Sequence, residues 1–71
     1  MHTDTPAVDV TVENHGTVFL FHLHTQAARE FVALKVAPEP WQMMGNALAT
    51  EWRFARDLAD AMVNDGRLVV R

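Results

Sequence analysis

The stretch VDVTVENHGTVFLFHLH, residues 8–24, decides the fold that the sequence predicts. Valine occupies every second position from 8 to 12 and alternates with polar residues, which is the pattern of a strand with one buried face. A second run, from Thr17 to His24, is rich in valine and phenylalanine, and Gly16 lies between the two runs. The stretch therefore predicts a β-hairpin.

The apolar residues also favour one register of this hairpin. A three-residue loop at residues 14–16 would place Val12 opposite Val18 and the phenylalanines opposite polar residues. A two-residue loop at His15 and Gly16, both with the positive φ that such a turn needs, collects the apolar side chains on one face. We therefore expect the two-residue loop, with Val12 facing Phe19, Val10 facing Phe21 and Val8 facing Leu23.

Two helices are predicted after the hairpin. Thr25 is a suitable N-cap for a helix over residues 26–36, and the prolines at 38 and 40 end it. Residues 52–64 form the clearest helix, and Gly66 is expected to take the left-handed conformation that follows a helix. The faces expected to be buried are Ala27, Ala28, Phe31, Leu34 and the stem of Lys35 in the first helix, and Phe54, Ala55, Leu58, Ala61 and Met62 in the second.

The remaining segments complete the predicted topology. Residues 41–51 carry a helical stripe that Gly45 interrupts, so we expect a loop followed by a short strand at residues 47–50. Residues 67–71 predict a last strand. The order β-β-α-β-α-β is typical of a two-layer α+β sandwich with a four-stranded sheet and both helices on one face. Residues 7–71 would form this single domain, after a flexible N-terminal tail at residues 1–6.

Composition excludes several classes of function. The chain has 71 residues, a net charge of −3 and no cysteine, and it also lacks serine. Disulfides, thiolate nucleophiles, cysteine-ligated metals and Ser-His-Asp catalysis are therefore absent. The acidic balance argues against nucleic acid as a partner, and no stretch reaches the roughly 20 apolar residues of a membrane span. We expect a cytoplasmic protein without a cofactor, whose small core makes a homodimer plausible.

Several strings in the chain resemble a family of small uncharacterised bacterial and prophage-type proteins. The resemblance covers residues 10–70 and rests on HGTVFL (residues 15–20), AAREF (27–31) and GNAL (45–48), together with Thr25, Trp41, Glu51, Arg53, Phe54, Leu58, Met62, Asp65 and Gly66. It implies the same fold and a strand at Ala47. It adds no catalytic residue, because the family has no assigned activity.

His22 and His24 are the most specific local indication of a chemical function in the sequence. On a strand they point the same way, about 7 Å apart, and the expected register places Asp9 directly opposite His22. Two histidines and a carboxylate form a known transition-metal pattern, so metal binding by His22, His24 and Asp9 is an alternative function. His15 would lie on the order of 23 Å away along the strand. The competing interpretation is an ordinary polar pair on a solvent-facing strand.

The main functional hypothesis comes from apolar side chains that the predicted core does not bury. Val18 and Leu20 would lie on the sheet face that the helices leave open, and Trp41, Met43 and Met44 would form a second patch in a loop. The competing interpretations are core filling by the tryptophan and ordinary scattered surface apolarity. Because the carboxylates are scattered and no nucleophile is evident, we expect no enzyme. The sequence predicts a protein-interaction module, a prophage-type accessory protein that self-associates or docks on a partner protein.

Overall fold

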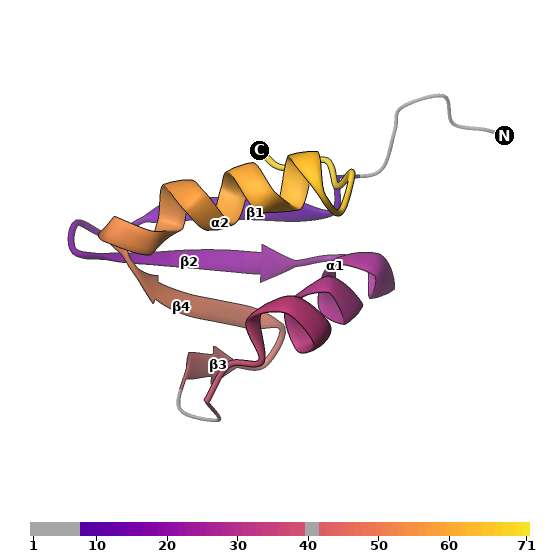
Figure 1. Ribbon diagram of the computed structural model, residues 1–71. Coiled ribbons are helices and arrows are strands. Elements are labelled where there is room, and N and C mark those ends of the chain that lie inside the picture. Colours follow the sequence, from indigo (N-terminus) through magenta and orange to yellow (C-terminus); the bar gives the residue numbers. More distant parts are fainter. Residues whose placement is uncertain (1–7, 40–41) are drawn as a thin grey trace, which may run out of the picture.

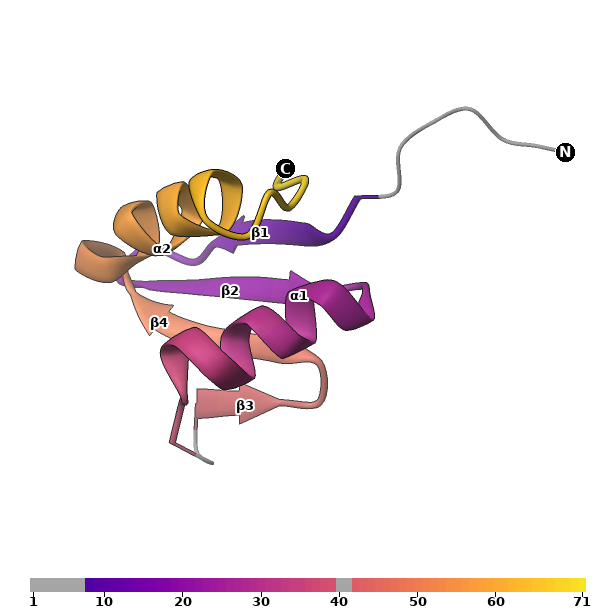
Figure 2. The same cartoon turned by 45° about the vertical axis from the view of Figure 1, so that its right-hand side comes forward.

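The computed structural model describes residues 8–39 and 42–71, so the predicted tail at residues 1–6 lies outside the described part (Figure 1). Its elements, in chain order, are strands β1 (Val10–Asn14) and β2 (Val18–Leu23), helix α1 (Gln26–Phe31) with its π-helical continuation η1 (Val32–Val36), strands β3 (Met43–Met44) and β4 (Ala47–Glu51), and helix α2 (Trp52–Asn64). The strands form one antiparallel sheet in the order β1-β2-β4-β3. Both helices lie on the same side of this sheet (Figure 2). The α+β class and a four-stranded sheet with two helices are confirmed, but the strand predicted at residues 67–71 is not one of the four.

The predicted order β-β-α-β-α-β is wrong, because the fourth strand is β3 and the observed order is β-β-α-β-β-α. A tight turn at Gly45 and Asn46 brings Met44 opposite Ala47, so part of the expected loop pairs with β4. Residues 67–71 run beside β1, where a single parallel bridge joins Val10 to Val70. The backbone hydrogen bonds from the Val10 N–H to Val69, from the Arg71 N–H to Val10 and from the Val12 N–H to Arg71 follow the pattern of a parallel pair, but the pairing amounts to this one bridge and adds no strand to the sheet.

The hairpin register differs from the prediction by two residues. Val10 lies opposite Leu23 and Val12 opposite Phe21, and Val8 precedes the strand. The turn is centred on Gly16 and Thr17, since the His15 N–H donates to the Val18 carbonyl at 2.9 Å. Gly16 has a φ of 86°, as expected, whereas His15 does not share the positive φ. Glycine thereby takes the first central position, the place it occupies in a type II′ turn.

A shift of two residues leaves every side chain on its predicted face, because side chains alternate with a period of two along a strand. The face that meets the helices carries the expected apolar residues, and Phe21 is fully buried there. Leu48 on β4 lies opposite Phe21 and adds to the same layer. The buried cluster joins the sheet, both helices and the C-terminal segment, and consists of Val10, Phe21, Leu23, Ala28, Val32, Leu48, Ala55, Met62 and Leu68.

Both predicted helix ranges are confirmed. The Thr25 hydroxyl accepts a hydrogen bond from the Ala28 N–H at 3.2 Å, which makes Thr25 the N-cap that the sequence predicts. The helix widens at its C-terminal end, where the Ala37 N–H donates to the Val32 carbonyl at 2.9 Å, a spacing of five residues. Ala37 itself has a left-handed φ of 49° and ends the segment ahead of Pro38.

The predicted buried faces of the helices are only partly confirmed. Ala28 is buried and Phe31 packs against the core, but Ala27, Leu34 and Lys35 are exposed. The π-helical turn adds residues per turn, so the 3.6-residue period used for Leu34 no longer applies there. In α2, Ala55 and Met62 are buried, whereas Phe54, in the same first turn as Ala55, is 58% exposed.

Gly66 has a different role from the predicted one. The left-handed residue after α2 is Arg67, with a φ of 54°. A Cβ on Gly66 would lie 2.7 Å from Cδ2 of Phe31 and 3.0 Å from the Met62 carbonyl oxygen. Glycine is therefore needed because the end of α2 packs directly against the ring of Phe31 on α1.

Candidate interaction surface

The sheet face opposite the helices, called the open face below, is covered by no other element of the described chain (Figures 1 and 2). The strand pairing arranges its side chains in rows across the sheet. The first row crosses β1, β2, β4 and β3 and consists of Thr11, His22, Ala47 and Met44. The second row consists of Glu13, Leu20 and Ala49. The third row consists of Val18 and Glu51.

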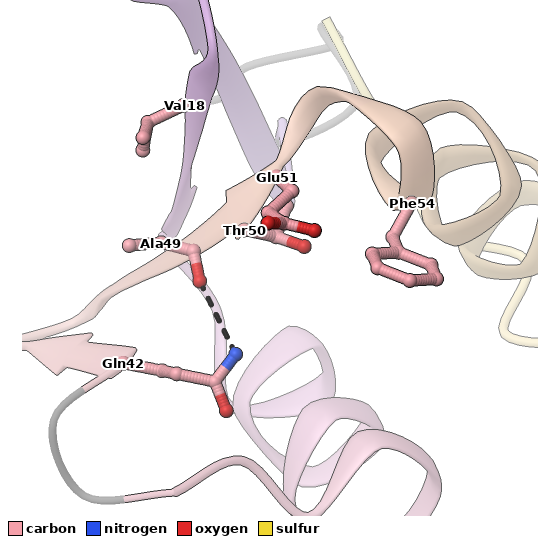
Figure 3. Close-up of a pocket in the computed structure, with 6 residues that line it drawn as sticks. All are labelled: Val18, Gln42, Ala49, Thr50, Glu51 and Phe54. Carbon is pink, nitrogen blue, oxygen red and sulfur yellow. Dashed lines mark hydrogen bonds between the residues drawn. The ribbon is translucent and has the colours of Figure 1, made fainter.

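The open face has a ridge and a furrow side by side. Strand β2 has Val18, Leu20 and His22 on this face, while the neighbouring β4 has the much smaller Ala49, which is partly exposed, and Ala47, which is 7% exposed between His22 and Met44. Two hollows adjoin the alanines, and each extends around the sheet to residues of the helix side, Thr50 and Phe54 in the first and Leu23 and Arg29 in the second. The first, of about 240 Å³, is lined by Val18, Gln42, Ala49, Thr50, Glu51 and Phe54 (Figure 3). The second, of about 360 Å³, is lined by Leu20, His22, Leu23, His24, Arg29, Met44, Asn46 and Ala47.

Gln42 closes the outer side of the first hollow. Strand β3 is too short to pair with the whole of β4, and the Gln42 side-chain amide donates to the Ala49 carbonyl at 3.4 Å where the strand pairing ends (Figure 3). The ring of Phe54 approaches from α2 on the other side in the same view. Most of the surface lining this hollow is therefore hydrocarbon, and the Glu51 carboxylate is its one ionisable side chain.

The predicted interaction residues separate into two groups. Val18 and Leu20 lie on the open face as expected, with Val18 40% exposed, and Met44 at its edge is 61% exposed. Met43 was misassigned, because it alternates to the other face and packs against the core. Trp41 lies outside the described residues. The sequence analysis missed Ala47 and Ala49, although their two-residue spacing in a predicted strand would have placed them on one face.

A polar cluster lies at the β1 side of the open face. The Glu13 carboxylate is hydrogen-bonded to Nε2 of His22 and lies 3.9 Å from Nε2 of His15. His24 Nε2 is 2.8 Å from the Thr11 hydroxyl, and the rings of His22 and His24 stack with centroids 6.5 Å apart. The same-side orientation of the two histidines is confirmed. Treating His15 as remote was wrong, because Glu13, two residues before it, is also a cross-strand diagonal neighbour of His22, so both histidines reach the same carboxylate.

Asp9 does not join these histidines. Thr11, not Asp9, lies opposite His22 in the observed register. The Asp9 carboxylate accepts one hydrogen bond from the Thr25 hydroxyl at 2.6 Å and another from the Val69 N–H at 2.8 Å. These two bonds hold the pKa of Asp9 below its ordinary value, and the bond from Thr25 has the larger effect. Asp9 therefore links the start of β1 to the helix cap and the C-terminal segment, and the predicted metal set is not assembled.

Across residues 8–39 and 42–71, no group of three or more histidine, aspartate or glutamate side chains has the arrangement of a metal site. Cysteine ligands are absent from the chain. Over the same residues, neither helix is long and apolar enough to cross a bilayer.

The contact between Glu13 and His22 gives a direct prediction for titration. The hydrogen bond from His22 lowers the pKa of Glu13, and the positive charge of His22 adds to the effect. Carbon-detected NMR of the Glu13 carboxyl is expected to show a midpoint below the ordinary glutamate value of about 4.3. His22→Asn should raise that midpoint toward the ordinary value. The matched change His24→Asn should leave it in place, and an equal response to both changes would contradict the contact.

Comparison with known proteins identifies no relative. A scan against protein-family models and searches of curated proteins and of solved structures each found no match. The resemblance to small prophage-type proteins therefore stays a prediction from the sequence. Any functional conclusion depends on the geometry of the open face.

Proposed function

We propose that the chain is a small protein-interaction module whose contact surface is the open face of its sheet. One observation carries this proposal: the central strands β2 and β4 present apolar side chains on a face that no described element covers. In a sheet with one solvated face, polar side chains are the rule at such positions. Contiguous apolar side chains there are typical of a surface that another protein covers.

The distribution of apolar and ionisable side chains over the open face supports the same proposal. Apolar side chains occupy the middle, and the ionisable groups Glu13, His22 and Glu51 lie around them. An apolar centre with a polar rim is the usual anatomy of a protein–protein interface. Met44 at the edge is exposed, and the unbranched methionine side chain can adapt its shape to a partner surface.

The polar groups of this face favour binding over catalysis. His22 is paired with Glu13 and His24 with Thr11, so each candidate acid or base is held by a neighbour. Glu51 is the one ionisable side chain among the residues that line the first hollow. The second hollow brings His22, His24 and Arg29 together, but no carboxylate, hydroxyl or thiol of the described residues lines it to act as a nucleophile. A reaction site needs a nucleophile or an acid–base pair that converges with such groups on one point. We therefore propose a non-enzymatic role.

Site-specific photo-crosslinking in the source cells tests this proposal. The photoreactive residue p-benzoylphenylalanine replaces Met44 on the open face in one variant and Val63 on α2 in a matched control. The two positions are comparably exposed, at 61% and 49%, but lie on opposite sides of the sheet. We expect protein adducts from position 44 only.

A second change shows whether the open face itself makes the contact. Leu20→Lys places a charge in the middle of this face and should remove the adduct formed at position 44. An adduct of any protein, including another copy of this chain, supports the proposal if it is lost in that variant. The absence of adducts at position 44, or equal adducts at both positions, would overturn it.

A further inference from the structure

We infer that the partner that fits the open face is a second copy of this chain, packed face to face about a two-fold axis parallel to β2 and β4. This inference rests on the proposed function and names its partner. Two packed sheets normally keep their strands within about 30° of each other, as such an axis allows. The contact is isologous, so each copy uses the same surface.

The shape of the face selects this axis. The ridge on β2 and the furrow on β4 are adjacent, one strand spacing apart. A two-fold axis that runs between them lays the ridge of each copy in the furrow of the other. In the row that contains Leu20, the register then places Leu20 over Ala49 of the partner subunit, and in the next row it places His22 over Ala47 of the partner subunit.

Other arrangements of two copies pack less well. An axis perpendicular to the strands would lay ridge on ridge and leave the two furrows facing each other as an unfilled gap. Atoms that line such a gap lose their contacts, which removes the attraction that holds packed surfaces together. Large side chains opposite small ones are the arrangement that fills space between two layers.

The charges of the face are compatible with this pairing. Glu13 on β1 comes to lie over the β3 side of the partner, where Gln42 and Met44 are uncharged. Glu51 lies in the last row, at the end of the face, where it meets Val18 of the partner subunit at the solvent-accessible rim. The pairing therefore brings no two carboxylates of these rows together, and like charges in contact are what usually prevents self-association.

The area of the open face determines the affinity that we expect for the dimer. Strands β1, β2, β3 and β4 have 5, 6, 2 and 5 residues, which at a strand spacing of about 4.8 Å and a rise of about 3.4 Å per residue gives a flat footprint on the order of 290 Å² per copy. A standard interface buries about 800 Å² per partner, so this contact belongs to the weak, transient class. We therefore expect a dimer that is concentration-dependent and dissociates on dilution.

Sedimentation velocity of the full chain from about 10 µM to about 1 mM tests the inference. The wild type is expected to shift from monomer to dimer over this range. Leu20→Lys should raise the dissociation constant at least about tenfold, because it drives a charge into an apolar furrow. Within one copy the new lysine lies directly opposite Glu13, an opposite-charge pair that preserves the hairpin.

Two further variants distinguish shape complementarity from nonspecific hydrophobic association. Ala49→Leu makes the face more apolar but fills the furrow, and it should weaken the dimer by at least about tenfold. Val63→Lys, on the exposed side of α2, should leave the dissociation constant within about twofold of the wild type. Dimerisation of Ala49→Leu as tight as that of the wild type would overturn the inference.

The inference and the proposed function can fail separately. A wild type that remains monomeric at the highest concentration overturns the second copy as partner. If position 44 then forms a crosslink to a different protein, and Leu20→Lys removes it, the interaction module stands and only its partner is changed. An adduct with the mass of two copies of this chain supports both.

Discussion

Phe21→Ala is expected to leave most of the protein unfolded at 25 °C. The Phe21 side chain is fully buried at the centre of the core, between Val12 on β1 and Leu48 on β4. Removing a buried phenylalanine costs about 3–5 kcal/mol, and a core of this size supplies a total stability of similar magnitude. Urea titration followed by far-ultraviolet circular dichroism measures the loss as a lower midpoint or as a missing folded baseline.

Phe54→Ala is the matched control for this prediction. Phe54 is 58% exposed, so the same change of side chain removes little buried surface. The free energy of unfolding should stay within about 0.5 kcal/mol of the wild type, the usual range for surface substitutions. A loss at Phe54 as large as the loss at Phe21 would contradict the observed orientation of α2.

Asp9→Ala is expected to lower the free energy of unfolding by about 2–3 kcal/mol. A hydrogen bond to a charged group contributes about 1.5–3 kcal/mol, and the partial exposure of Asp9 to solvent reduces the total for its two bonds. Its carboxylate accepts from Thr25 and from the Val69 N–H, residues that lie 16 and 60 positions further along the chain. The change therefore releases both the cap of α1 and the C-terminal segment. Urea titration at neutral pH provides the measurement, and amide hydrogen exchange at Val69 should accelerate.

The same carboxylate predicts a dependence of stability on pH. The pKa of Asp9 is lower in the folded chain than its ordinary value of about 3.9. Its stabilisation is therefore fully present above the unfolded pKa and is lost as the pH falls through the lower folded pKa. Urea titrations at a series of acidic pH values should show a shallower acid loss in Asp9→Ala than in the wild type. An unchanged slope would contradict the two hydrogen bonds.

Local patterns in the sequence predicted much of the fold. Alternation over residues 8–24 assigned the inner face of the hairpin, and Thr25 marked the start of the first helix. The range predicted for the second helix, residues 52–64, is that of α2. These features depend on contacts between residues close together in the chain, where backbone geometry imposes a period of two or of 3.6.

The features that were missed depend either on the geometry of a turn or on contacts between residues far apart in the chain. The two-residue error in the hairpin register arose because the apolar pattern is equally satisfied by any shift of two, and only the turn at Gly16 and Thr17 distinguishes them. The role of Gly66 depends on Phe31, which is 35 positions earlier in the chain. The separation of Asp9 from His22 follows from the same register and from its bond to Val69.

The sequence by itself determined which side chains of each strand share a face, because that property is local to the strand. Only the tertiary structure decided that β4 lies between β2 and β3. The pairing of β2 with β4 puts Leu20 beside Ala49, 29 positions away in the chain, and so creates the ridge and furrow of the open face. Alternation carries no information about that pairing, since each strand's pattern is satisfied by any neighbour with the same buried side. The candidate interaction surface is therefore a product of strand order.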